Sequence, residues 1–282
     1  TWKDVRIVGD VNGAAFDAGE TAMTPMDSAG EPRAWIGNTR MPVLAESEAT
    51  YKSALDTIFS AKATTRGYLH SGSCEYVSSV NGRRYRRPAA DLLGALQMSV
   101  SEEVNIAWLG LGALVGATIT DDNGNPKHHD ESVTPGLDDS RFSVLRTWEG
   151  RAGVYANKPR IFSAEGSDFD ITPKREVMNI AKIAVRAYLE TRLNAPILID
   201  TTTGYILEEE AIDIETGANA ALSATLLAKP KASGATFVLS RTDNLLSTKT
   251  MNGQTRIVPL AYAEAIVTDI AFENPALQVV AV

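Results

Sequence analysis

The sequence predicts an α+β fold, with mixed and antiparallel sheets packed by two long helices in the C-terminal half and a smaller, irregular α/β part before them. Apolar residues recur at helical spacing over 173–194 and 208–229, and alternating or β-branched stretches surround those segments. We therefore expect a loop-rich α/β portion over 1–140, an α+β core domain over 141–262 and a strand or arm for pairing between subunits over 263–282.

The N-terminal half contains many turn-forming residues. The first ~40 residues are rich in Gly, Pro, Asp and Asn, which predicts loops with short strands. A helix is predicted over "SEATYKSALDTIFSAKATTRGY", capped by Ser47 or Thr50. "YLHSGSCEYVSSVNGRRY" predicts strand, turn and strand, with Asn81-Gly82 at the hairpin turn. Pro88 then opens a helix in "PAADLLGALQMSV".

The C-terminal half shows clearer periodicity. "RFSVLRTWEG" predicts a strand, and "GVYANKPRIF" predicts a hairpin that turns at Asn157. Thr172 is the predicted cap of the first long helix. "ATFVLSRT" and "TRIVPLAY" predict strands, the second at an edge or bulge because Pro259 has no N–H to donate. The apolar stripe of the second long helix is Ala211, Ile214, Ala218, Leu222 and Leu226.

Charge argues against a dedicated nucleic-acid binder. The formal net charge is −8, whereas such proteins usually carry a basic surface. One basic cluster, "GRRYRRP", holds Arg83, Arg84, Arg86 and Arg87, and it indicates either an anion-binding or protein-docking patch or a solvated loop. No segment approaches the ~18 consecutive apolar residues of a membrane span, so we expect no membrane insertion.

No set of residues predicts catalysis. Cys74 is the only cysteine, and it needs a histidine partner in space to act as a nucleophile; His70 is its neighbour in sequence. His128, His129 and Asp130 lack further ligands at a spacing typical of a metal site. We therefore expect a protein that is not an enzyme and that holds neither cofactor nor metal.

The run "WLGLGALVGATI" is the strongest argument for an alternative function. Gly110, Gly112 and Gly116 would allow a backbone to approach a pyrophosphate, which predicts a nucleotide-binding enzyme domain. A dinucleotide loop needs a full helix and a second strand after it, however, and the turn at Asp121 follows almost at once. An apolar strand pair with glycines at bends fits the spacing better.

The last residues predict a strand that pairs with another subunit. "AEAIVTDIAFEN" alternates, and the apolar tail "PALQVVAV" follows it. An extended apolar segment has unpaired backbone groups that must be covered, and the sheet of a neighbour would cover them. Pairing within the same subunit is the alternative. The predicted interface residues are Ile266, Thr268, Ile270, Phe272, Leu277, Val279 and Val280.

The order of these segments resembles that of the sheath proteins of contractile bacteriophage tails. The resemblance covers roughly residues 83–282 and is carried by "RRPAADLLGALQMSV", by "FSVLRTWEGRAGVYANKPRIFSAEGSDFDITPKREVMNIAKIAVRAYLETRLN", by "TGYILEEEAIDIE" and by "TRIVPLAYAEAIVTDIAFENP". Where the familiar pattern has "W-G-A-R-T", this chain has "YANKPRIFS", which indicates a divergent branch.

The resemblance implies a structural subunit of the virion that is assembled in the bacterial host cytoplasm. Such subunits stack as rings in a helical homo-oligomer around a tail tube, alongside baseplate and tail terminator proteins, and contract to drive the tube through the host envelope. Their terminal extensions add strands to the sheets of neighbours, so we expect an N-terminal arm upstream of Thr1. Arg83, Arg84, Arg86 and Arg87 would then contact the tube or a neighbour. A tube or baseplate component is the second alternative.

Overall fold

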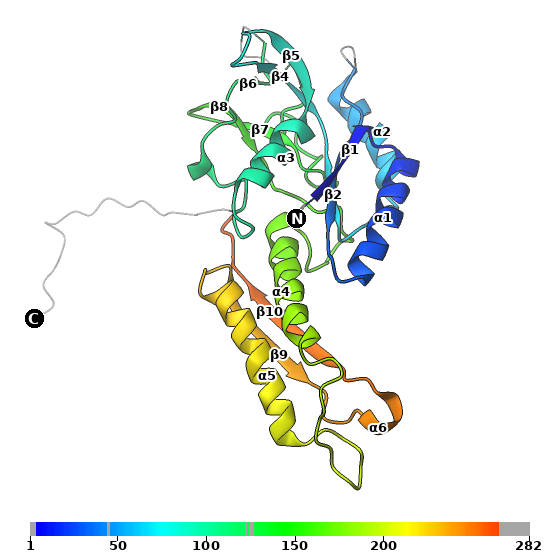
Figure 1. Ribbon diagram of the computed structural model, residues 1–282. Coiled ribbons are helices and arrows are strands. Elements are labelled where there is room, and N and C mark those ends of the chain that lie inside the picture. Colours follow the sequence, from blue (N-terminus) through cyan, green and yellow to red (C-terminus); the bar gives the residue numbers. More distant parts are fainter. Residues whose placement is uncertain (1–3, 44–45, 122, 124–126, 265–282) are drawn as a thin grey trace, which may run out of the picture.

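The computed structural model describes residues 4–43, 46–121, 123 and 127–264. Its regular elements are β1 (Asp4–Asp10), α1 (Gly13–Ser28), β2 (Ala34–Asn38), α2 (Glu48–Phe59), β3 (Gly67–His70), β4 (Ser73–Val77), β5 (Arg84–Pro88), α3 (Ala89–Ser99), η1 (Leu109–Leu111), β6 (Ala117–Thr118), β7 (Leu145–Trp148), β8 (Arg151–Ala156), α4 (Thr172–Glu190), α5 (Glu208–Leu222), η2 (Ser223–Leu227), β9 (Ala232–Leu239), α6 (Leu245–Thr248) and β10 (Gly253–Pro259). The predicted α+β class is confirmed. Figure 1 shows two lobes, which we call the N-terminal lobe (4–171) and the C-terminal lobe (172–259).

The expectation of loops over the first 40 residues is wrong, because α1 occupies 16 of them. Asn12 caps this helix by accepting a hydrogen bond from the Ala15 amide at 2.9 Å. Phe16, Gly19 and Met23 form its buried face against the parallel sheet β1-β2-β3. Gly19 allows a close approach there, since a Cβ would lie 3.1 Å from Ile7 and 3.2 Å from the Trp35 ring. The glycine that permits this close packing also hid the helical pattern.

The predicted hairpin at Asn81-Gly82 is confirmed. β4 pairs with β5 in antiparallel register from Ser73↔Pro88 to Val77↔Arg84. Residues 78–83 form the loop between the strands, and Gly82 in this loop has φ +68°, a left-handed conformation that glycine adopts without strain. On its other side β4 pairs with β6, so β5 is an edge strand. Helix α3 begins directly after Pro88, as predicted.

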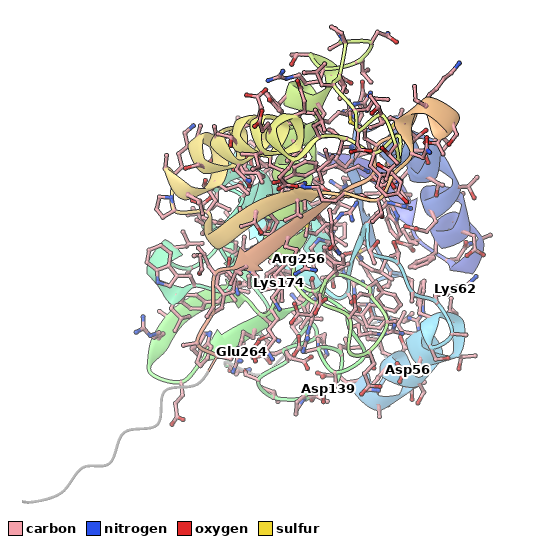
Figure 2. All side chains as sticks on the ribbon, turned by 90° about the horizontal axis from the view of Figure 1, so that it is seen from below. Asp56, Lys62, Asp139, Lys174, Arg256 and Glu264 are labelled. Atoms are coloured by element: carbon pink, nitrogen blue, oxygen red, sulfur yellow. The ribbon has the colours of Figure 1, made fainter. Side chains whose placement is uncertain are left out.

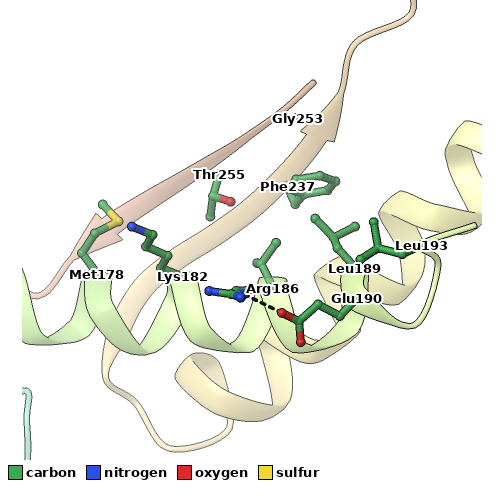
Figure 3. Close-up of a pocket in the computed structure, with 10 residues that line it drawn as sticks. Met178, Lys182, Arg186, Leu189, Glu190, Leu193, Phe237, Gly253 and Thr255 are labelled. Carbon is green, nitrogen blue, oxygen red and sulfur yellow. Dashed lines mark hydrogen bonds and ion pairs between the residues drawn. The ribbon is translucent and has the colours of Figure 1, made fainter. Parts of the chain in front are cut away.

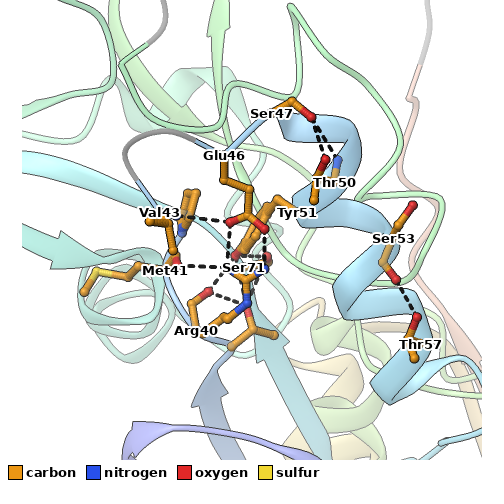
Figure 4. A network of polar contacts seen from close by, with 12 residues as sticks. Arg40, Met41, Val43, Glu46, Ser47, Thr50, Tyr51, Ser53, Thr57 and Ser71 are labelled. Carbon is orange, nitrogen blue, oxygen red and sulfur yellow. Dashed lines mark hydrogen bonds and ion pairs between the residues drawn. The ribbon is translucent and has the colours of Figure 1, made fainter.

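Helix α2 begins where the sequence predicts, with Ser47 as its N-cap. One residue of this helix joins three parts of the N-terminal lobe: the Tyr51 hydroxyl donates to the Arg40 carbonyl at 2.7 Å and lies 2.8 Å from the Ser71 hydroxyl (Figure 4). Arg40 in turn forms a two-pronged ion pair with Glu46, at 2.7 and 2.5 Å. This network fixes the loop between β2 and α2 against the end of β3.

The second predicted hairpin turns at a different place. β7 pairs with β8 through Trp148↔Arg151, so the turn lies at Gly150 (φ +72°) and not at Asn157. After β8 the chain bends, and Arg160 bridges to Ile171. The Asn-Lys-Pro signal therefore marks the end of a strand instead of a reversal.

The core of the N-terminal lobe joins the two sides of the boundary expected at residue 140. The rings of Phe142 and Phe162 are 5.1 Å apart, and Phe162 also lies 5.7 Å from Phe16 of α1. Val144 belongs to the same cluster. The division into 1–140, 141–262 and 263–282 stays a prediction. The structure shows that Phe142, Val144 and Phe162 share one core with residues before position 140.

The C-terminal lobe is a two-helix layer on one face of the β9–β10 hairpin. All five residues of the stripe predicted for α5 are at most 1% exposed, and the helix ends in the π-helical turn η2. The other long helix, α4, runs alongside α5. The cap predicted for α4 is wrong: Ile171 is the N-cap, and the Thr172 hydroxyl donates to the Pro159 carbonyl at 2.8 Å.

Candidate subunit-interaction surfaces

The outer edge of β9 is sealed by side chains of α5. The Phe237 amide donates to the Asn219 side-chain oxygen at 2.7 Å, and the Asn219 amide group donates to the Phe237 carbonyl at 3.1 Å. The Leu239 amide donates to Glu215 at 2.7 Å. An added strand would have to displace these bonds, so this edge is closed to pairing.

Glu215 is held in place by an arginine. Arg241 contacts both of its carboxylate oxygens, at 2.7 and 2.9 Å, and also binds Glu208 at 2.7 Å. The bond from Arg241, with further help from the Leu239 amide, lowers the pKa of Glu215, so the carboxylate remains an acceptor at neutral pH. The acidic first turn of α5 thus contributes to the seal on β9.

The outer edge of β10 is open among the described residues. Phe237 directs its backbone groups away from β10, so its partner Thr255 directs its own N–H and C=O away from β9. The same alternation turns the backbone groups of Gly253 and Ile257 outward. In the part of the chain that the structure describes, no third strand pairs with this edge.

A groove of about 560 Å³ lies along this open edge (Figure 3). One wall is α4 and the turn that follows it; α4 contributes the apolar side chains of Val185 and Leu189, and the turn contributes the 71%-exposed Leu193. The floor is Phe237, whose ring passes so close to Gly253 that a Cβ there would lie 2.3 Å from it. The groove thus places unpaired main-chain groups beside an apolar wall, the combination that an extended strand requires.

The interface residues predicted in the C-terminal arm, from Ile266 to Val280, lie outside the described residues. Their role in subunit pairing stays a prediction, and so does the pairing of the arm within or between subunits.

The predicted arginine cluster lies on the exposed edge strand β5 and the turn before it. Arg84 is 3.6 Å from Glu75, and Arg87 is 3.4 Å from Asp91. Arg86 donates to the Pro42 carbonyl and to the Ser73 hydroxyl. The Arg83 guanidinium has no partner among the described residues. Two of the four arginines thus pair with carboxylates of their own chain, and contact of the cluster with a tube or a neighbour stays a prediction.

The single thiol is not poised for nucleophilic chemistry. Burial, with a smaller contribution from Asp91, raises the pKa of Cys74 to about 12, so the thiol is protonated at neutral pH. The fully buried His70 has its pKa lowered to about 3 by desolvation and by Arg6. Neither residue has the other as a hydrogen-bond partner.

Sequence reasoning missed a serine–histidine contact. The Ser73 hydroxyl lies 2.9 Å from Nδ1 of His128, residues 55 positions apart in the chain, and no local spacing signals such a pair. Ser73 is fully buried, and burial and the nearby Arg86 lower the pKa of His128 to about 4. Because the Ser73 hydroxyl is buried and His128 is only 6% exposed, the contact is part of the core.

The other two residues of the His-His-Asp run are structural. His129 bridges two carboxylates, with Nδ1 3.1 Å from Glu48 and Nε2 2.8 Å from Glu131. Burial disfavours the charged ring, but the two acidic partners outweigh it and raise the pKa of His129 to about 9. Asp130 accepts bonds from the Thr147 and Ser132 amides. No cluster of three or more potential metal ligands occurs among the described residues.

The glycine run does not form a nucleotide loop. It contains the short helix η1 and the two-residue strand β6, and the next element is β7, not a crossover helix. The apolar strand pair that we expected is also wrong, because only β6 is a strand. Gly112 (φ +83°) and Gly116 (φ +73°) adopt left-handed conformations, so the glycines do serve bends.

Comparisons with known proteins identify the fold. No family model and no curated protein sequence matches the chain. Similar solved structures include the baseplate of the anti-feeding prophage (12% identity, TM-score 0.58, covering 93% of this chain and 65% of that one). They also include the contracted sheath of the extracellular contractile injection system PVC (11%, 0.62, 92% and 68%) and a sheath tail protein from Listeria innocua (12%, 0.51, 93% and 57%).

The chain therefore has the fold of contractile sheath proteins. Its 11–12% identity to these structures agrees with the divergent branch predicted from the sequence. It spans 65% of the length of the anti-feeding prophage chain, so part of that chain has no counterpart here. Within the described residues, every helix is too short or too polar to cross a membrane.

Proposed function

We propose that this protein is a structural subunit of a contractile sheath, and that it polymerises by lending a strand to the sheet of the next copy. The open outer edge of β10, lying beside the apolar groove under α4, carries this proposal. The similar solved structures support it, because they come from baseplate and contracted sheath assemblies.

The arm of a second copy fits this edge. A strand added to β10 satisfies the outward N–H and C=O groups of Gly253, Thr255 and Ile257. Since side chains alternate along a strand, one face of the arm, with Ile266, Ile270 and Phe272, covers the groove while Asp269 and Glu273 on the other face stay in water. The apolar tail from Leu277 to Val280 extends the contact.

The finer part of the proposal is the particle itself. A sheath of this kind surrounds a tail tube, joins a baseplate and terminator, and drives the tube through an envelope by contracting. We propose a bacteriophage tail as the particle, built in the host cytoplasm, with a phage-like injection system as the alternative. The anti-feeding prophage and PVC structures support that alternative, and the anti-feeding prophage baseplate structure supports a sheath-like component near the baseplate as a further one.

A proline in the open edge tests the proposal. In Thr255→Pro the lost N–H is one that points away from β9, so the hairpin keeps its ladder while the incoming strand loses a bond worth about 0.5–1.5 kcal/mol and meets the proline ring. Thr255→Val keeps the N–H and is the matched control. Electron microscopy should show hollow cylinders for the wild type and for Thr255→Val, and dispersed subunits for Thr255→Pro.

Deletion of residues 275–282 tests the donor side of the same contact. We expect a folded, soluble subunit that does not polymerise, with circular dichroism unchanged. Cylinders of normal length from Thr255→Pro, or from the truncated chain, would refute strand donation to β10.

A further inference from the structure

The segment after β10 leaves the C-terminal lobe and binds the N-terminal lobe. β10 ends at Pro259, yet the Tyr262 hydroxyl donates to the Glu103 carbonyl at 2.6 Å, in the loop after α3. Two residues later Glu264 forms an ion pair with Lys158 at 2.6 Å, and Lys158 follows β8. Figure 1 shows this crossing between the lobes, and Figure 2 labels Glu264 near the β7–β8 hairpin. We call Glu103, Lys158, Tyr262 and Glu264 the exit latch.

The loop that receives Tyr262 also receives the start of β9. Lys231, just before that strand, has only 13% of its side chain exposed; its ammonium contacts Glu102 and lies 3.9 Å from Glu103. The same short loop therefore holds Lys231, just before the hairpin, and Tyr262, just after it. The segment that enters β9 and the segment that leaves β10 are therefore both bound to the N-terminal lobe.

The latch contacts are suited to neutral pH. Burial, together with the charge of Glu103, raises the pKa of Tyr262 to about 12, so its hydroxyl stays a donor. Lys158 lies between two carboxylates, Glu264 at 2.6 Å and Asp138 at 3.8 Å. Lys158 is thus attracted to the body of the N-terminal lobe as well as to the exit segment.

Without such a latch, the end of β10 is the weakest point of the ladder. The register shifts between Val258 and Pro259, and Pro259 has no N–H to pair. A pull on the following residues would act on this irregular end and open the two-stranded hairpin one bond at a time. A pull that is first borne by Tyr262 and Glu264 enters the N-terminal lobe instead.

We propose that the exit latch is a strain relief, which transfers tension on the residues after Glu264 to the N-terminal lobe and so protects the open β10 edge from being peeled off. The inference rests on the proposed function, in which a neighbouring copy holds the arm. In the proposed assembly, β10 of each subunit pairs with the arm of one neighbouring copy, while the subunit's own arm is held by a second neighbouring copy. The latch keeps tension on the subunit's own arm from acting on β10.

Single-subunit force spectroscopy tests this without polymerisation. Handles are attached at Leu246→Cys, which is 70% exposed in the wild type, and at Ala265→Cys; the native Cys74 is buried and protonated, so it does not compete for labelling. The latch variant carries Tyr262→Phe and Lys158→Gln. Arg256→Gln is the control, since Arg256 is exposed on β10 and hydrogen-bonds only to Gln254 among the described residues.

The lifetime of β10 under constant load is the readout. We expect the latch variant to lose β10 about tenfold faster than wild type, which corresponds to about 1.4 kcal/mol, because both latch contacts are lost, while the control is unchanged. Equal lifetimes for latch variant and wild type would overturn the inference. Because free subunits are pulled, failure to form cylinders would contradict the proposed function alone.

Discussion

One residue, Asn219, contributes two of the hydrogen bonds that close the outer edge of β9. Its side chain satisfies both backbone groups of Phe237, at 2.7 and 3.1 Å, in a partly buried position between α5 and the hairpin. In Asn219→Ala both bonds are lost, and the Phe237 N–H and C=O are left without partners. Each bond contributes about 0.5–1.5 kcal/mol net, and a stranded, partly buried backbone group costs at least as much. We therefore expect a loss of about 2–3 kcal/mol in the free energy of unfolding.

The assay is urea unfolding followed by circular dichroism, with hydrogen exchange at the Phe237 amide as a local readout. The midpoint should fall while the slope stays constant, since the surface exposed on unfolding is nearly unchanged. Thr216→Ala is the matched control: it is one turn away on the exposed side of α5, and we expect it to stay within about 0.5 kcal/mol of wild type.

The result that refutes this reasoning is a loss below about 0.5 kcal/mol with unchanged protection of the Phe237 amide. It would mean that the β9 edge is not sealed by Asn219, and that both edges of the hairpin accept strands.

Two further predictions concern the N-terminal lobe. Because the folded pKa of His129 (about 9) lies above its ordinary value of 6.5, its bridge to Glu48 and Glu131 stabilises fully below pH ~6.5 and is lost as the pH rises through 9; the melting temperature should fall over that window in wild type and not in His129→Gln. Gly116→Ala should cost at least 1–2 kcal/mol in urea unfolding, because φ is +73° and the new Cβ would lie 2.8 Å from a carbonyl oxygen. The control Gly150→Ala, with the same φ and open space, should cost less, and an equal loss would rule out the steric contribution.

Periodicity predicted the C-terminal lobe well because its core is built from single helix faces. The stripe of α5, from Ala211 to Leu226, is buried as a whole, so local spacing contains the whole signal. Helix α1 was missed for the opposite reason. Gly19 is a poor helix former, and the close packing that it allows is against Trp35, which lies outside the helix in β2. The turn at Gly150 was misplaced because a nearby proline gave a stronger local signal.

The candidate surfaces were less predictable because they depend on contacts between distant residues. Nothing in the spacing of Asn219 and Phe237 shows that one closes the strand edge beside the other. The exit latch likewise joins Tyr262 to Glu103 across 159 positions. The sequence shows an alternating apolar segment beyond Glu264, but the open edge of β10 and the groove beside it emerge only when α4 and the hairpin are placed together.

The asymmetry of the hairpin bears on the symmetry of the assembly. A two-stranded hairpin is marginal alone, and here α4 and α5 stabilise it through their buried stripes, so the sheet is left incomplete without loss of the fold. One edge is sealed and the other open, while the proposed donor strand belongs to a different part of the chain, beyond Glu264. The proposed donor and acceptor surfaces are therefore unlike, and the proposed contact is heterologous. A heterologous contact does not close on itself as a two-fold dimer does; it propagates into rings or helices, which is the geometry that a sheath requires.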